Sequence, residues 1–190
     1  QNQDPNAKTI PWDFAVIHAD FINAFALPGG IIRVTDKLLQ ELHLTDAEIA
    51  ALLGHEMGHV LKRHSQQRML QEQLTSYIIQ ALTYEDGDDH QETFGEAIGE
   101  LFLKGATFLG KQSFSRTNEY EADATAWEML TANKSKYSPR AVGGLLRKLW
   151  AISGGTGLTS WESTHPGTKD RIDALRMQWE SLEPRERRRL

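Results

Sequence analysis

The sequence has 190 residues, which is the size of one domain of ordinary length. Hydrophobic residues make up 39% and charged residues 25%, values that exclude a disordered chain and a fibrous repeat. The formal net charge of −5 argues against nucleic acid as the main partner. The sequence contains no cysteine, which excludes disulfides, thiolate zinc sites and cysteine nucleophiles together.

The sequence indicates how many domains the chain has and whether it spans a membrane. We find no internal repeat and no linker, and we therefore expect a single domain over 1–190 with a core over about 10–182. No run approaches the ~18 apolar residues of a membrane span, so we expect no transmembrane segment in this chain. The chain begins at Gln1 rather than Met, which is typical of a processed chain and compatible with a lipid anchor in the precursor.

Three short runs near the start of the chain are rich in β-forming residues. They cover residues 10–17, 23–27 and 31–35, and a Pro-Gly-Gly turn signal at 28–30 separates the last two. We therefore predict a small antiparallel sheet. The small and apolar residues of 23–27 suit either a core strand or a sheet edge that accepts an extended substrate as an added strand.

A helix is predicted after this sheet. Thr45 and Glu48 have the spacing of a capping box, and apolar residues then continue at helical spacing through residues 47–64. A small sheet followed by many helices is typical of the α+β class. The further predicted helices cover 68–84, 93–111, 119–130, the segment from Pro139 to the glycines at 154–155, and the segment from Pro166 to about Leu182, with an acidic loop over 85–92.

Residues 55–59 read HEMGH, which is the HExxH pattern, within the first predicted helix. His55 and His59 are four residues apart and lie on one face of the helix, where both imidazoles can reach one Zn²⁺. Glu56 lies one residue further round the helix, suitably placed to meet the water that the zinc activates. A carboxylate there can take a proton from that water and return it to a leaving amine. The pattern predicts a peptidase site with one zinc ion.

Catalytic zinc requires a third protein ligand and an open fourth position. A metzincin would have Gly at position 62 and His at position 65, whereas this sequence has Lys62 and Ser65, which excludes that class. His64 follows His59 by five residues and is off the ligand face of the helix. We therefore expect His64 to be a surface histidine.

The acidic segment 119–123 (EYEAD) offers carboxylate ligands. Glu119 and Asp123 are four residues apart on a predicted helix, so one can bind zinc while the other accepts the N–H of a zinc-bound histidine. Alternatively, Glu119 and Glu121 are ordinary acidic residues of a first helical turn, favoured by the helix dipole. Spacing alone leaves both interpretations open.

HEMGH followed downstream by EYEAD resembles the HExxH…ExxAD pair of the zinc peptidases that include HtpX and the CAAX prenyl proteases. Residues 23–30 (NAFALPGG) are similar to the segment before the HExxH helix in that family, and residues 163–166 (STHP) with Arg171 resemble its C-terminal element. The four matches occur in the family's order and cover nearly the whole chain. Because the chain lacks membrane spans, it is most similar to the soluble bacterial envelope members of the BepA and LoiP type.

The resemblance implies a mostly helical, gluzincin-like peptidase fold with a small sheet beside the HExxH helix. It also implies a role for each matching residue. His55, His59 and Glu119 would be the zinc ligands. Glu56 would be the general base, and Asp123 would accept a hydrogen bond from a zinc-bound histidine.

The C-terminal element and the strand before the HExxH helix carry further implied roles. His165 would lie near the metal, where it either stabilises the oxyanion or closes the site as an extra ligand. Arg171 matches the family arginine near that histidine. The substrate edge strand would comprise Asn23, Ala24, Phe25 and Ala26.

The activity that the resemblance implies is zinc-dependent endopeptidase action on unfolded or misassembled proteins, in quality control of the bacterial envelope. The protein would then be periplasmic, with an outer-membrane lipid anchor as one option, and envelope assembly proteins would be partners beside the polypeptide substrate. Two alternatives stay open: a chaperone-like assembly factor whose peptidase site is held shut, and a structural zinc domain with His165 as fourth ligand. The intact Glu56 favours the enzyme, because binding alone would not need it.

Overall fold

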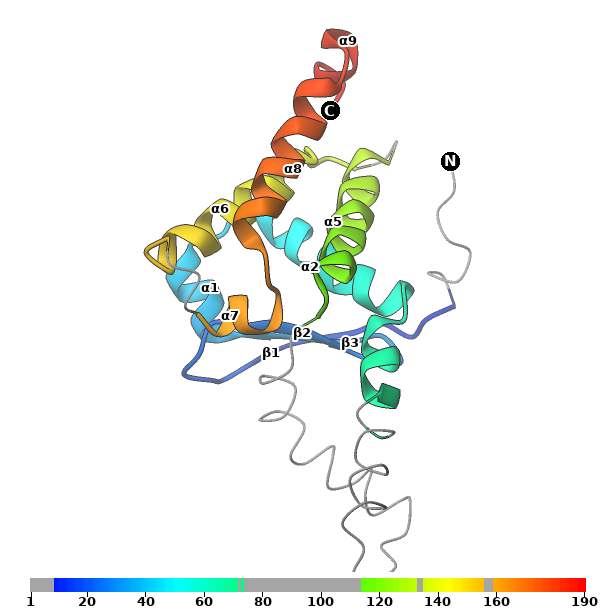
Figure 1. The fold of residues 1–190 in the computed structure, drawn as a ribbon, viewed down its shortest axis with the longest axis vertical. Coiled ribbons are helices and arrows are strands. Elements are labelled where there is room, and N and C mark those ends of the chain that lie inside the picture. The colour runs from blue at the N-terminus through cyan, green and yellow to red at the C-terminus, as the bar shows by residue number, and fades with distance from the viewer. Residues whose placement is uncertain (1–8, 72, 74–113, 133–134, 156–158) are drawn as a thin grey trace, which may run out of the picture.

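The computed structural model describes residues 9–71, 73, 114–132, 135–155 and 159–190. A small sheet with many helices confirms the predicted α+β class (Figure 1). Within these residues, none of the helices combines the length and the apolar character that crossing a bilayer requires. The elements in chain order are β1 (Asp13–Ile17), β2 (Ala24–Leu27), β3 (Ile31–Thr35), α1 (Asp36–Leu42), α2 (Asp46–Leu61), α5 (Arg116–Thr131), α6 (Arg140–Ile152), α7 (Ser160–Thr164), α8 (Thr168–Ser181) and α9 (Pro184–Arg187).

The three strands form a mixed sheet in the order β1-β3-β2. β2 and β3 pair antiparallel through the predicted turn, where Gly29 and Gly30 have φ angles of +86° and +90° that favour glycine. β1 pairs parallel to β3, so the prediction of an antiparallel sheet is wrong for this strand. The reason is that β3 inserts between β1 and β2 instead of following them as a third hairpin strand. The side chain of Asp36, at the end of β3, bonds Ala19 and His18 and so holds the β1–β2 connection across that end.

The helix that carries HExxH begins as predicted, whereas other helix boundaries differ. Thr45 and Glu48 form the predicted capping box at the start of α2. α5 begins earlier than predicted, because the Ser115 side chain caps it. α8 begins after Gly167, whose φ is +82°, instead of at Pro166. α1, α7 and α9 were not predicted. Of the helix predicted over 68–84, the described residues 68–71 and 73 are helical, and the helix over 93–111 and the loop over 85–92 lie outside the described residues.

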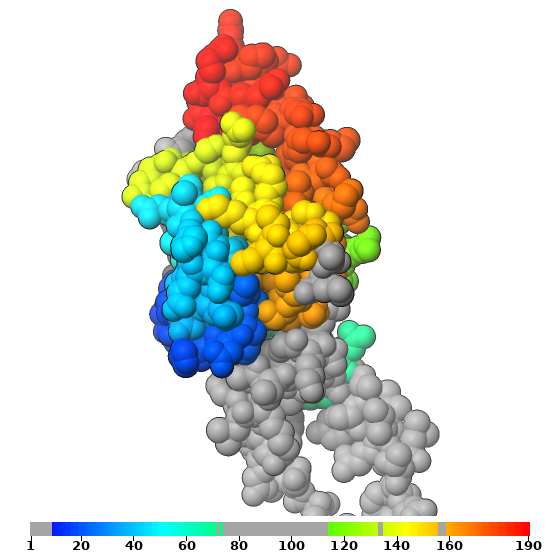
Figure 2. Space-filling view, turned by 90° about the vertical axis from the view of Figure 1, so that its left-hand side faces the viewer, coloured from blue at the N-terminus to red at the C-terminus, as the bar shows by residue number. Residues whose placement is uncertain are grey.

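The apolar core lies between the sheet and the helices. Figure 1 shows α1, α5, α6 and α8 on one side of the sheet, with α2 passing between the sheet and α5. Leu38 of α1, Leu52 of α2 and Trp127 of α5 are buried together with Leu145 and Leu146 of α6. In the space-filling view of Figure 2, the surface of α6 (yellow) lies between the first strands and helices (blue to cyan) and α7 and α8 (orange). The single domain over 1–190 stays a prediction.

The contact between α2 and α5 is unusually close and sets the position of the HExxH residues. Gly54 and Gly58 of α2 face Ala126 and Ala122 of α5. A Cβ atom added to Gly58 would lie 2.9 Å from the Cα of Ala122, and one added to Gly54 would lie 3.3 Å from the Cα of Ala126. The two backbones are therefore in direct contact, and the HExxH and ExxAD segments lie next to each other.

Candidate metal centre

α2 and α5 bring the predicted zinc ligands together in the interior. His55, His59 and Glu119 are each at most 1% exposed. The Nε2 atoms of His55 and His59 are 3.2 Å apart, and Glu119 Oε1 lies 3.3 Å from the Nε2 of His59. Glu119 Oε2 lies 3.5 Å from the Nε2 of His55. Two imidazole nitrogens and a carboxylate converging in this way form the donor set of many catalytic zinc sites.

His165 completes a four-residue cluster with these side chains. It ends α7, and its Nδ1 lies 3.2 Å from Glu119 Oε1 and 3.4 Å from His55 Nε2. The ligand atoms of His55, His59, Glu119 and His165 all lie within 4.8 Å of one another. A site with these four donors fits a tetrahedral metal ion, and with three of them it leaves the fourth position open.

Aromatic rings and a backbone carbonyl hold the cluster's imidazoles in place. Trp161 stacks on His165 with ring centroids 4.1 Å apart, and Phe114 stacks on His59 at 3.9 Å. The Nε2 of His165 donates to the carbonyl of Ala24 in β2, at 3.3 Å. His165 is thus oriented by β2 on one side while its other nitrogen faces the cluster.

Asp123 and Arg171 bond the cluster residues His55 and Glu119 and so fix their orientation. Asp123 Oδ1 lies 3.0 Å from the Nδ1 of His55, so this imidazole is held with its Nε2 toward the cluster. The guanidinium of Arg171, from α8, donates to both oxygens of Asp123 at 2.7 Å and also to Glu119. Arg171 is 1% exposed, and its planar fork fixes the two carboxylates relative to each other.

Glu56 has an environment unlike that of the other carboxylates. It is fully buried, and neither carboxylate oxygen has a hydrogen-bond partner among the described residues. The Nε2 of His165 lies 3.7 Å from its Oε1. Burial raises the pKa of Glu56, so its basicity is high for a carboxylate. A buried unpaired carboxylate costs stability and is found where a reaction uses it.

The pKa values of the two HExxH histidines shift in opposite directions, and the pKa of Glu119 is lowered. Burial lowers the pKa of His55, but its hydrogen bonds to Asp123 and Glu119 outweigh this and raise the pKa to about 9. Burial likewise raises the pKa of Glu119, but the charges of His165 and Arg171 hold it well below its usual range. Burial lowers the pKa of His59, which keeps that imidazole neutral as a metal ligand requires.

His64 is not a surface histidine, so that prediction is wrong. It is 3% exposed, and its Nδ1 lies 3.0 Å from the Nδ1 of His59. The prediction assumed a helix continuing through residue 64, but α2 ends at Leu61 and Arg63 adopts a left-handed conformation with φ of 60°. No residue type in the sequence marks that turn, because arginine seldom adopts positive φ.

The predicted substrate strand lies at an edge of the sheet and is covered by side chains. Ala24 and Ala26 of β2 are buried in the core. The carbonyl of Ala24 accepts from His165, and the carbonyl of Ala26 accepts from the hydroxyl of Ser65 at 2.7 Å. Asn23 accepts the Ala24 N–H and contacts Thr164 of α7 through its side chain. Phe25 is half-buried. The strand therefore contributes buried side chains to the core and also lies beside the four-residue cluster.

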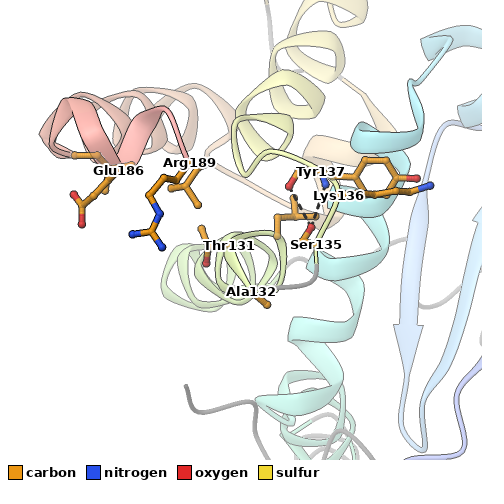
Figure 3. A pocket seen from close by; sticks show the side chains of 10 residues that line it. Thr131, Ala132, Ser135, Lys136, Tyr137, Glu186 and Arg189 are labelled. Atoms are coloured by element: carbon orange, nitrogen blue, oxygen red, sulfur yellow. Dashed lines mark hydrogen bonds between the residues drawn. The ribbon is translucent and has the colours of Figure 1, made fainter.

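A separate cavity of about 490 Å³ lies away from the cluster (Figure 3). Thr131 and Ala132 line it at the end of α5, with Lys136 from the following loop and Glu186 and Arg189 from the C-terminal end of the chain. It contains none of the predicted site residues. Among the described residues that line it, no group of side chains is arranged to bind a metal ion.

Fold and donor set together define a metallopeptidase site on an α+β scaffold. The sequence matches the family described as Peptidase family M48 over residues 3–178, and the chain belongs to that family. It is 33% identical over 166 residues to the mitochondrial metalloendopeptidase OMA1 of Arabidopsis thaliana, which covers 87% of this chain and 31% of that protein. It is 29% identical over 171 residues to the metalloprotease LoiP of Escherichia coli, covering 90% of this chain and 64% of that protein.

A third relative comes from another bacterium. The chain is 31% identical over 150 residues to the β-barrel assembly-enhancing protease of Yersinia pestis, covering 76% of this chain and 29% of that protein. The chain thus spans about a third to two thirds of the length of these relatives. The predicted family is confirmed: the chain belongs to a peptidase family, and the relatives that it matches are metalloproteases. These relatives come from mitochondria and from bacteria, so they leave the predicted envelope location a proposal.

Proposed function

We propose that this protein is a zinc-dependent endopeptidase, with His55, His59 and Glu119 as the zinc ligands. The observation that carries the proposal is the fully buried Glu56, whose carboxylate has no hydrogen-bond partner among the described residues and lies beside a cluster of metal-ligand side chains. Two imidazoles and a carboxylate are a donor set that zinc prefers, and the absence of thiols disfavours softer metals. When bound, zinc supplies Lewis-acid catalysis by polarising a peptide carbonyl and lowering the pKa of water to about 7.

The residues around the cluster divide the remaining work. Glu56 takes the proton from the attacking water and delivers it to the leaving amine, a role for which its raised pKa is suited. Asp123 orients the His55 ring, and Arg171 holds the Asp123 and Glu119 carboxylates in place. Once His165 leaves the carbonyl of Ala24, an extended polypeptide would lie along β2, whose residues Asn23 to Ala26 border the cluster.

His165 accounts for a closed state of the same site. Its Nδ1 converges with the three other ligand atoms, and four protein donors leave no position for water. We infer that the resting enzyme is closed by His165, and that withdrawal of this side chain opens the site. Once displaced, His165 can donate a hydrogen bond to the developing oxyanion, where one donor contributes about 10²–10³ in rate.

The substrate class and the location rest on the relatives. A relative named for enhancing β-barrel assembly, together with LoiP, supports proteolysis of unfolded or misassembled proteins in the bacterial envelope. We propose a periplasmic protein of this kind, with an outer-membrane lipid anchor in the precursor and envelope assembly proteins as partners. Cell fractionation with an antibody against this chain tests the location.

Peptide cleavage by the purified chain, with and without chelator, tests the proposed activity. Glu56→Gln should retain one zinc per chain but lose about 10²–10⁴ in cleavage rate, because Gln cannot accept the proton. His165→Ala should raise the rate if closure dominates and lower it if oxyanion stabilisation dominates. Full cleavage by Glu56→Gln, or cleavage that survives zinc removal, would refute the zinc endopeptidase.

A chaperone-like factor is the second candidate, favoured by the complete burial of the four-residue cluster. Such a protein would bind unfolded polypeptide and suppress its aggregation with equal efficiency in the wild type and in Glu56→Gln. An endopeptidase would instead degrade the same polypeptide only with Glu56 intact. Aggregation and cleavage assays run on one substrate separate the two functions.

A further inference from the structure

Each of the two HExxH imidazoles has a partner on the nitrogen that faces away from the cluster. For His55 that partner is Asp123, whose carboxylate is held by Arg171. For His59 it is His64, whose Nδ1 lies 3.0 Å from the Nδ1 of His59. The far nitrogen of His64, Nε2, lies 2.9 Å from Oε2 of Glu121, which is half-exposed. A chain of three side chains therefore runs from the cluster toward solvent.

The directions of these hydrogen bonds follow from the chemistry of the atoms. The Nε2 of His59 faces the cluster, so a neutral His59 that binds metal there carries its proton on Nδ1 and donates it. The Nδ1 of His64 must then accept that hydrogen bond, and the remaining proton of His64 lies on Nε2. Nε2–H in turn donates to Glu121, a carboxylate that can only accept. One tautomer of each ring satisfies every contact.

The local backbone places His64 for this contact. α2 ends at Leu61, and the left-handed conformation of Arg63 turns the chain back before residues 64–71 resume a helix. The next residue, Ser65, donates to the carbonyl of Ala26 in β2 and so fixes the turn to the sheet. The buried His64 is thereby held beside His59, although five residues separate them in the sequence.

We propose that His64 is a positioning residue for the metal ligand His59, and that Glu121 fixes its tautomer. This inference rests on the proposed function, since it requires His59 to bind the metal through Nε2. A partner on the outward nitrogen fixes the orientation of a metal-bound imidazole and raises its basicity, and its loss typically costs about 10–100-fold in metal affinity. Nothing in the HExxH or ExxAD pattern includes His64 or assigns Glu121 this role.

Two substitutions of His64 separate the hydrogen bond from the volume of the ring. The Oδ1 of Asn is attached to Cγ, as Nδ1 is in histidine, so His64→Asn keeps an acceptor close to the same place. His64→Phe keeps the ring but has no acceptor. We expect His64→Phe to weaken zinc binding by about 10–100-fold and His64→Asn to stay within about threefold of the wild type. Zn²⁺ competition with a chromophoric chelator measures this, and the exposed His18→Phe is the matched control.

Two further measurements keep the test decisive. The metal-free forms should unfold at the same temperature if His64 acts on the metal ligand, whereas a structural role would lower that temperature without changing the affinity ratio. In the zinc-loaded wild type, the ring ¹⁵N shifts of His64 should show the Nε2–H tautomer, and Glu121→Leu should reduce its population. The measurement of the ¹⁵N shifts in the wild type does not require that a variant at position 64 folds.

Each outcome decides the inference. Equal zinc affinity in His64→Phe and wild type, or an Nδ1–H tautomer of His64, would overturn it while leaving the zinc endopeptidase intact. A wild type that binds no zinc would instead refute the proposed function, and this inference with it. Weaker binding by His64→Phe together with rescue by His64→Asn would support the assignment.

Discussion

Arg171→Met tests how much the fold depends on the fork that joins the two carboxylates. Arg171 donates two hydrogen bonds of 2.7 Å to Asp123 and a third to Glu119, and the three residues are at most 3% exposed. Methionine has similar length but no charge, so the two buried carboxylates would lose the guanidinium that bonds both of them. Breaking a buried ion pair by removing one partner costs about 3–5 kcal/mol. We expect the metal-free protein to lose that amount of unfolding free energy.

Urea unfolding in the presence of a chelator measures the loss. With an m-value of about 2–3 kcal/mol per molar urea, the midpoint should fall by about 1–2.5 M. Arg116→Met is the matched control, because Arg116 and its partner Asp170 are more than half exposed and such a pair contributes about 0–1 kcal/mol. A midpoint for Arg171→Met equal to that of Arg116→Met would refute the reasoning that the buried fork holds the carboxylates.

Three other predictions address the ligands, the helix contact and pH. Glu119→Ala should abolish tight zinc binding, whereas Asp123→Asn should weaken it by about 10–100-fold; equal zinc content in Glu119→Ala and wild type would place the third ligand elsewhere. Gly58→Ala should force α2 away from α5 and lower both zinc affinity and the unfolding temperature. By contrast, Gly143→Ala should stabilise its helix by about 0.5–1 kcal/mol, because the nearest atom to its added Cβ would lie at the ordinary contact distance of 3.7 Å. If both substitutions stabilise, the backbone contact is not tight. The pKa of His55 is raised to about 9 above its ordinary 6.5, so this group stabilises the metal-free fold fully below pH 6.5 and the stabilisation is lost as pH rises through 9. Zinc must displace that proton, so its affinity should rise about tenfold per pH unit from pH 7 and level off above pH 9; a flat profile in chelator competition would contradict the raised pKa.

Local sequence signals predicted the elements that local interactions determine. The capping box of Thr45 and Glu48 needs only residues three apart, and the structure contains it. The HExxH helix and the β2–β3 turn also depend on neighbours in the sequence. Helical spacing indicated that His55 and His59 share a face, and their Nε2 atoms lie 3.2 Å apart. These features required no knowledge of the tertiary structure.

Features that depend on contacts between residues far apart in the sequence could not be predicted from local sequence signals. Parallel pairing of β1 with β3 depends on contacts between residues far apart in the sequence, such as the hydrogen bond from the Ala19 N–H to Asp36, 17 residues further along the chain. The burial of His64 depends on the left-handed conformation of Arg63, a residue type that does not favour it. Likewise, the resemblance placed Arg171 near His165, but its fork between Asp123 and Glu119 became evident only in three dimensions.

Because the backbones of α2 and α5 are in direct contact, the spacing of the candidate metal ligands does not depend on how well the side chains of the apolar core pack. Side chains between two helices can change rotamer and so shift the helix axes by small amounts, but Gly58 and Ala122 leave no such side chain at their crossing. The spacing between the HExxH and ExxAD segments is therefore set by hard contact of main-chain atoms. Substitutions in the leucine-rich core around α6 can consequently accumulate and erode stability while the ligand spacing stays the same. During evolution, such a chain would show a lower unfolding temperature long before the arrangement of its candidate metal ligands changed.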